Sequence, residues 1–301
     1  MSNIDVSPPR LAHVKAELFP PARKQYRILA FASKYPNVIV GTLLLLIVIA
    51  LSIFAPWLGT TDPTLIAPTR RTRPPSSDSW FGTDMLGRDL YSRVLYGGRV
   101  SLIVGFSVAI LASSIGLLVG LFAGFMRKAD GPVMRVMDGL MSIPPILLAI
   151  SLMALTQGSV GNVIIAVTIA EFPRVSRLTR GVVLSLRSQT YVEAAVAAGS
   201  RIPTIVLRHI LPNAVAPLVV QSTYICASAM IVEAILSFIG AGVPPIIPSW
   251  GNIMSEGRAL WQLRPHLIFI PALFLSMTVL AINLLGDGLR DALDPKGAAH
   301  V

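Results

Sequence analysis

The chain has 301 residues, of which 53% are hydrophobic and only 13% are charged, and its mean hydropathy is +0.70. An average soluble domain carries about 25% charged residues, so this composition excludes a disordered chain and argues against a soluble enzyme. The net charge of +10 fits basic loops at a membrane surface better than binding to nucleic acid. Because the apolar residues form long blocks, we expect an all-α, polytopic membrane protein.

Six apolar segments are predicted to cross the membrane, since a spanning helix needs about 20 mostly apolar residues. In chain order they cover residues 38–58, 100–126, 140–155, 160–172, 215–239 and 267–285. The third and fourth are short and separated by a brief polar stretch, which indicates a tight helical hairpin. The expected domains are a cytoplasmic tail at 1–36, a transmembrane domain at 37–296 and a short tail at 297–301. The first tail is expected to be either a helix on the membrane surface or a flexible segment.

Basic residues set the expected orientation. With the N-terminus inside, the inner segments carry 17 Lys and Arg and the outer segments carry 8, and basic residues collect on the cytoplasmic side of a membrane. Both termini are therefore expected in the cytoplasm, with a long outer loop at 59–99 and a long inner loop at 173–213. No cleavable signal peptide is expected, because the first apolar run begins only near residue 38.

The sequence offers no pattern for catalysis or for binding a cofactor or metal. The histidines His13, His209, His266 and His300 are scattered, and the single cysteine, Cys226, lies in an apolar run, where we expect a small core residue. There is no Gly-x-x-x-x-Gly-Lys-Ser/Thr loop to hold phosphates. Energy for active transport would therefore come from another chain or from an ion gradient.

Two acidic residues, Glu171 and Glu233, fall within or beside the predicted spans. A charge at the bilayer centre costs about 2.5–3.5 kcal/mol on insertion scales, so each is a candidate functional group. Glu233 would couple transport to a proton or cation in an ion-driven secondary transporter. Since Glu233 has no intramembrane Lys or Arg partner, we favour a carboxyl hydrogen-bonded into a helix interface. Glu171 is expected to pair with Arg174, three residues further on.

The second predicted span has small residues at intervals of four. They are Ala112, Gly116, Gly120 and Gly124. This spacing lets the backbones of two helices approach closely, and we expect plain helix packing, with the neighbour in this chain or in a partner.

The inner loop contains a predicted helix–turn–helix elbow that projects into the cytosol. Residues 191–198 are rich in helix formers, and Gly199 suits a left-handed C-terminal cap. Ser200 is expected to cap a second helix, with Pro203 in its first turn. Pro212 is expected to end that helix before the fifth span.

This elbow resembles the EAA loop of binding-protein-dependent ABC importer permeases. The matching residues are Glu193, Ala194 and Ala195, then Gly199, then Leu211 and Pro212. The sequence departs from the family pattern at His209, where the family has Ile. Three further segments, 81–102, 236–251 and 286–295, are similar to the C-type permease of dipeptide, oligopeptide and nickel importers. The resemblance covers about residues 38–296.

The resemblance implies a type I ABC importer permease fold in a bacterial inner membrane. It implies a homologous second permease, two cytoplasmic ABC ATPases and an external solute-binding protein as partners, with ATP hydrolysis on the partner chains. The elbow would be the coupling helix. Glu193, Ala194, Ala195 and Gly199 carry over by position, and we add their neighbours Ser200 and Arg201. Peptide, nickel chelate, glutathione and opine permeases share these motifs, so the solute stays open.

The segment at 82–93 has two interpretations. Asp84, Arg88, Asp89 and Arg93 are expected to pair locally in a tight outer loop, and docking of the binding protein is the functional alternative. For the whole chain, the alternative is a secondary transporter that uses Glu233 or Glu171, although the inverted repeats typical of that class are not apparent. An intramembrane enzyme is disfavoured, because no nucleophile–base pair is apparent.

Overall fold

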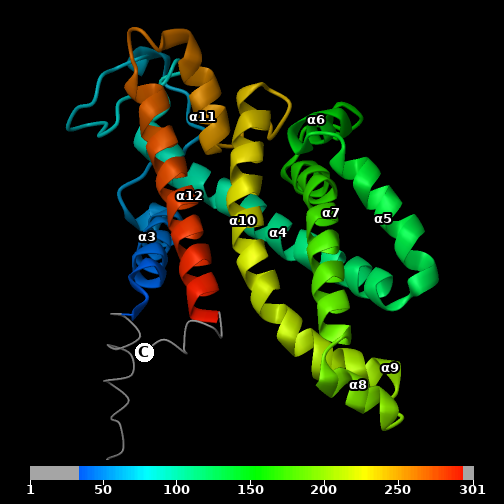
Figure 1. Ribbon diagram of the computed structural model, residues 1–301. Helices are drawn as coiled ribbons and strands as arrows, with labels where there is room; N and C mark the ends of the chain where they lie inside the picture. The colour runs from blue at the N-terminus through cyan, green and yellow to red at the C-terminus, as the bar shows by residue number, and fades with distance from the viewer. Residues whose placement is uncertain (1–33, 294–301) are drawn as a thin grey trace, which may run out of the picture. The chain divides into compact units, whose positions relative to one another are not determined.

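The computed structural model describes residues 34–293, and within them the chain is helical without a β-strand (Figure 1). The helices are α3 (Pro36–Ile53), α4 (Leu90–Phe125), α5 (Arg127–Met141), α6 (Pro145–Ala154), α7 (Val160–Arg187), α8 (Thr190–Ala197), α9 (Ile202–Ile205), α10 (Leu211–Phe238), α11 (Trp250–Gly257) and α12 (His266–Leu293). A π-helical turn, Val206–Ile210, joins α9 to α10. The predictions for the tail before residue 34 and for 297–301 lie outside the described residues.

Four helical segments are long and apolar enough to cross a membrane, or five if the bent pair α5–α6 counts as one span. The four are α3, α4, the continuous run from α9 through α10, and α12. The all-α membrane fold is confirmed, but the count of six spans is not reproduced. The segment expected at 140–155 is only the ten-residue α6, which meets α5 at a bend of 85°. A helix of that length is too short to cross a bilayer alone.

Two predicted boundaries were wrong by ten residues or more. The helix expected at 160–172 is the first half of α7, which continues through Pro173 to Arg187, so the first part of the expected inner loop is helical. The helix expected from residue 100 begins at Leu90, because the Asp89 side chain caps its N-terminus by accepting a hydrogen bond from the Ser92 amide. The loop between α3 and α4 therefore covers 54–89. We call the end of the molecule that carries the 54–89 loop the loop end, and the end that carries α8 and α9 the elbow end.

The long helices stand side by side in the order α3, α12, α10 and α7, and α4 crosses behind them (Figure 1). The small-residue face of α4 packs on α7. A Cβ on Gly116 would lie 2.4 Å from the Cβ of Val175, and one on Gly120 would lie 2.5 Å from the Cβ of Thr179. The predicted close packing is confirmed, and the neighbour belongs to the same chain.

The main core lies between α4, α10, α11 and α12, and the first half of α7 also packs against it. Its largest side chain, Trp250, is fully buried and donates an indole N–H to the carbonyl of Val94 at 3.0 Å. Cys226 is buried within the same core, as expected. A fully buried Trp with its N–H satisfied fixes α11 against the start of α4.

Candidate functional site

The predicted elbow is formed by α8, a glycine turn and α9. The chain leaves α8 through a left-handed residue, Gly199, with φ of +76°. Two hydrogen bonds close the turn, from the Ser200 amide to the Ala195 carbonyl (3.0 Å) and from the Gly199 amide to the Val196 carbonyl (3.0 Å). This is the Schellman pattern of helix C-termini, in which glycine is favoured because it has no Cβ. The predicted left-handed cap at Gly199 is confirmed.

Two local details of the predicted elbow were wrong. The N-cap of α9 is Arg201 and not Ser200, and no side chain caps this helix. Pro203 does lie in the first turn, as expected. Pro212 does not end the second helix, because it is the second residue of α10. The backbone instead continues from α9 into α10 through the π-helical turn.

The elbow has a small core of its own, which ties it to α7 and α4. Its buried members are Val183, Val192, Ile205 and Ile210, and Leu121, Phe125, Leu186 and Ala195 pack against them. Arg187, at the end of α7, donates from Nη1 to the Gly124 carbonyl (2.6 Å) at the last turn of α4. The Arg187 guanidinium also lies 5.3 Å from the ring centroid of Phe125. The elbow is therefore a rigid extension of α4 and α7 and not a loose loop.

The outer surface of the elbow carries exposed small and apolar side chains beside two charged ones. Of the six predicted site residues, Glu193, Ala194, Gly199 and Arg201 are exposed, and Ala195 and Ser200 are half-buried. The structure adds two apolar side chains, Val196 and Ile202, which are 59% and 62% exposed. Sequence reasoning missed them because both fit a helix core equally well. An apolar patch with a charged rim is typical of a protein interface.

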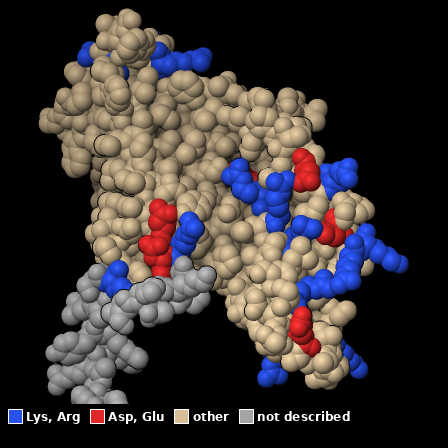
Figure 2. Space-filling model, viewed as in Figure 1, with Lys and Arg blue, Asp and Glu red and all other residues tan. Residues whose placement is uncertain are grey.

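Charged side chains gather over α5, the second half of α7 and the elbow (Figure 2). Two ion pairs join the helices there, Arg180 with Asp130 at 2.6 Å and Arg177 with Asp138. They connect α5 with the second half of α7, whose opposite face is buried against α4 through Val175, Thr179 and Val183.

A second charged cluster lies at the loop end and is largely buried. Asp84 accepts from Arg88 (2.6 Å) and from Arg93 (2.5 Å), and both arginines also pair with Glu256 of α11. Local pairing of the 82–93 segment is confirmed for three of its four residues. Asp89 pairs with neither arginine and caps α4 instead. The sequence carried no signal for Glu256, because it is more than 160 positions away.

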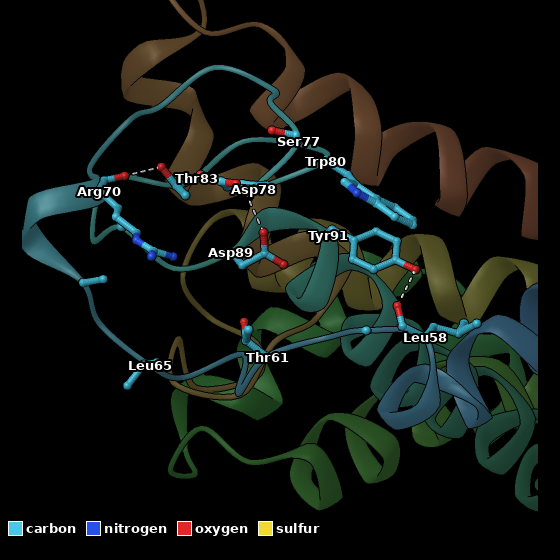
Figure 3. A pocket seen from close by; sticks show the side chains of 14 residues that line it. Leu58, Thr61, Leu65, Arg70, Ser77, Asp78, Trp80, Thr83, Asp89 and Tyr91 are labelled. Atoms are coloured by element: carbon cyan, nitrogen blue, oxygen red, sulfur yellow. Dashed lines mark hydrogen bonds between the residues drawn. The ribbon is translucent and has the colours of Figure 1, made fainter.

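The loop of residues 54–89 encloses a pocket of about 300 Å³ beside this cluster. Trp80 and Tyr91 form one wall, with ring centroids 4.9 Å apart, and the hydroxyl of Tyr91 donates to the Leu58 carbonyl at 3.2 Å (Figure 3). Asp89 faces the pocket, where the Ser79 hydroxyl donates to it at 2.6 Å. The loop is thus held in one shape by its own hydrogen bonds.

The two membrane carboxyls are both in helix interfaces. Glu233 is fully buried, and it accepts hydrogen bonds from the hydroxyls of Ser101 (3.0 Å) and Ser237 (2.8 Å). Glu171 accepts from Ser228 at 2.9 Å, and its other oxygen lies 3.7 Å from Arg174, the predicted partner. The hydrogen-bonded interpretation of Glu233 and the pairing of Glu171 are confirmed.

Comparison with known proteins places the chain among transport proteins. A family model described as "Binding-protein-dependent transport system inner membrane component" matches residues 116–297. The chain belongs to this family. It is 51% identical to a probable peptide ABC transporter permease protein of Sinorhizobium fredii, over 92% of this chain and 94% of that protein. It is 38% identical to the oligopeptide transport system permease OppC of Bacillus subtilis, over 85% of each chain.

A solved structure supports the fold of this permease. The MetNI methionine ABC transporter, in an inward-facing conformation, matches 67% of this chain and 96% of its own with a TM-score of 0.57 at 22% identity. The permease is thus a multi-pass inner-membrane subunit of an ABC importer and not an enzyme. These findings favour the importer over the ion-coupled secondary transporter. Such a permease works with ATPase and solute-binding partners.

Proposed function

We propose that this permease serves an ATP-driven importer of short peptides, in which the elbow docks on a cytoplasmic ATPase. The permease pairs with a homologous second permease, and each contributes half of the translocation path. Both of its termini lie in the cytoplasm, which the excess of Lys and Arg on the expected inner segments supports. The peptide class is supported by relatives that are named peptide, dipeptide and oligopeptide permeases.

The observation that carries the proposal is the uncovered patch on a rigidly anchored elbow. Ala194 and its small neighbours allow a partner to approach the backbone closely, and Val196 and Ile202 offer apolar area to bury. Glu193 and Arg201 lie on the rim, where charges steer and orient a partner. The coupling site then consists of Glu193, Ala194, Ala195, Gly199, Ser200 and Arg201, with Val196 and Ile202 added.

The anchoring explains how ATP would drive transport. When the ATPase pair closes on ATP, a docked elbow moves with it. Because the elbow shares a core with α4 and α7, its displacement turns those helices as a rigid body and exchanges the side on which the cavity opens.

A charge placed on the elbow patch tests the docking. Val196→Glu should reduce the ATPase subunit that co-purifies with the permease after mild detergent extraction, because a buried unpaired carboxylate opposes association. Val136→Glu on α5 is the matched control, since Val136 is 60% exposed and Val196 is 59% exposed. Equal recovery of ATPase with both variants would contradict the proposal. The solute class is tested separately by uptake of labelled dipeptides and tripeptides that requires the binding protein.

A further inference from the structure

A groove between α3 and α4, at the loop end, is lined by apolar side chains and by the arginine Arg99. Its volume is about 710 Å³, and its walls include Ile49 and Ile53 of α3 and Leu102, Ile103, Phe106 and Ile110 of α4. Four of the wall side chains are exposed, Ile53 (55%), Ile103 (54%), Phe106 (38%) and Ile110 (65%), whereas Leu102 is buried. The proposed function uses none of these residues.

The cation is Arg99, and the end of α3 holds it in place. Its Nε donates to the Ser52 carbonyl at 2.7 Å, and one of its terminal nitrogens donates to the Ile53 carbonyl at 2.9 Å. The guanidinium also lies 4.6 Å from the ring centroid of Tyr96. No carboxylate pairs with Arg99 in the part of the chain that the structure describes. Its charge is therefore fixed in position and left without an anionic partner, and its remaining N–H groups are free to donate.

The depth of Arg99 in a bilayer follows from the length of α3. A helix of 18 residues is about 27 Å long, which nearly matches the roughly 30 Å of bilayer hydrocarbon. The last carbonyls of α3, and with them Arg99, then lie at the boundary between hydrocarbon and headgroups. Phe54 and Trp57 follow directly and are 53% and 75% exposed, as is typical of aromatic residues at that boundary.

The groove is long enough to hold much of one acyl chain. From Arg99 to Ile110 the rise along α4 is about 16 Å, a length comparable to half of the hydrocarbon thickness. Because α4 is inclined to the other long helices (Figure 1), an acyl chain that starts beside Arg99 would run obliquely into the hydrocarbon along the groove. The headgroup phosphate of the same lipid would meet the guanidinium, which matches phosphate oxygens in geometry and charge.

The side chains on this face of α4 also favour a lipid over a partner helix. Transmembrane helix interfaces are enriched in small residues, and α4 uses its small face, around Gly116 and Gly120, against α7. The groove face bears large side chains such as Phe106 and Ile110 instead. We propose that this groove binds one anionic phospholipid, with its phosphate on Arg99 and one acyl chain between α3 and α4.

A photo-crosslinker tests the occupant directly. A benzophenone amino acid is substituted at Ile103, and the permease complex is placed in vesicles of phosphatidylcholine with or without phosphatidylglycerol and irradiated. The expected product is an adduct whose added mass is one phospholipid, formed preferentially with phosphatidylglycerol. An adduct to another protein chain would show a helix in the groove and would overturn the proposal.

Variants of the cation test its role. Arg99→Gln should lower the yield of the phosphatidylglycerol adduct about tenfold, because a charge-assisted hydrogen bond is lost. Arg258→Gln is the control, since Arg258 is an exposed arginine outside the groove. Equal yields from the two lipids, or an unchanged yield with Arg99→Gln, would overturn the assignment. Because Arg99→Gln also removes a cap from α3, proteolysis of the 54–89 loop serves as a check that α3 stays in place.

Discussion

Replacing Gly199 with valine should uncouple ATP hydrolysis from uptake. Its φ of +76° lies in the left-handed region, and a Cβ there would meet nothing within 4 Å, so the effect is purely one of backbone strain. The left-handed conformation costs a residue with a Cβ about 1–2 kcal/mol, and more for a β-branched one. By itself this lowers the population of the observed elbow relative to its alternatives about 5- to 30-fold.

The assay is the number of ATP molecules hydrolysed per solute taken up, measured with the complete importer in vesicles. That ratio should rise with Gly199→Val and stay near the wild-type value with Gly199→Asn, because asparagine tolerates the left-handed region. Gly240→Val is the matched control, since Gly240 has φ of +84°, open surroundings and a position at the loop end. The reasoning is refuted if Gly199→Val keeps the wild-type ratio, or if Gly240→Val shifts it equally.

Three further changes probe the packing, the charged cluster and the buried carboxyl. Gly120→Val should destabilise the permease by about 1–3 kcal/mol through overpacking, since its Cβ would lie 2.5 Å from a side chain of α7; an unchanged melting temperature in detergent would contradict this. Arg93→Met should lower the free energy of unfolding by about 3 kcal/mol, because Asp84 and Glu256 lose one of their two arginine partners. Protease should then cut the 54–89 loop faster, and wild-type resistance would argue against a stabilising cluster. Glu233→Gln keeps an acceptor oxygen for one serine hydroxyl, offers an N–H to the oxygen of the other, and should retain ATP-driven uptake; loss of uptake by an intact assembly would point back to ion coupling.

Much of the fold could be predicted from the sequence, because a helix that crosses a bilayer must be a long, mostly apolar segment. The helices α10 and α12 begin within four residues of the predicted segments, at Leu211 and His266. The boundaries of α7 were not predictable in the same way. Its second half is charged and resembles a loop, and it stays helical because Val175, Thr179 and Val183 form a buried face against the glycines of α4. Which residues of α7 meet those glycines depends on the tertiary fold and not on a local pattern.

The elbow shows the same division between local and tertiary information. The turn at Gly199 could be predicted, because the left-handed residue that ends many helices is usually glycine. The anchoring was not, since Val183, Val192 and Ile210 form one core from three helices or turns. Exposure of Val196 and Ile202 likewise becomes visible only once that core is known.

The helix α4 is one uninterrupted rod of 36 residues, about 54 Å long. Near one end Arg93 binds the charged cluster, and at the other end the Gly124 carbonyl receives Arg187 beside the elbow. The two ends of α4 therefore contact the charged cluster and the elbow through one continuous helix. If a protein that binds the 54–89 loop shifts α4, linkage requires that a movement of the elbow change the affinity at that loop by the same factor. In the proposed importer, α4 is the element that would connect the 54–89 loop directly with the elbow that docks on the ATPase.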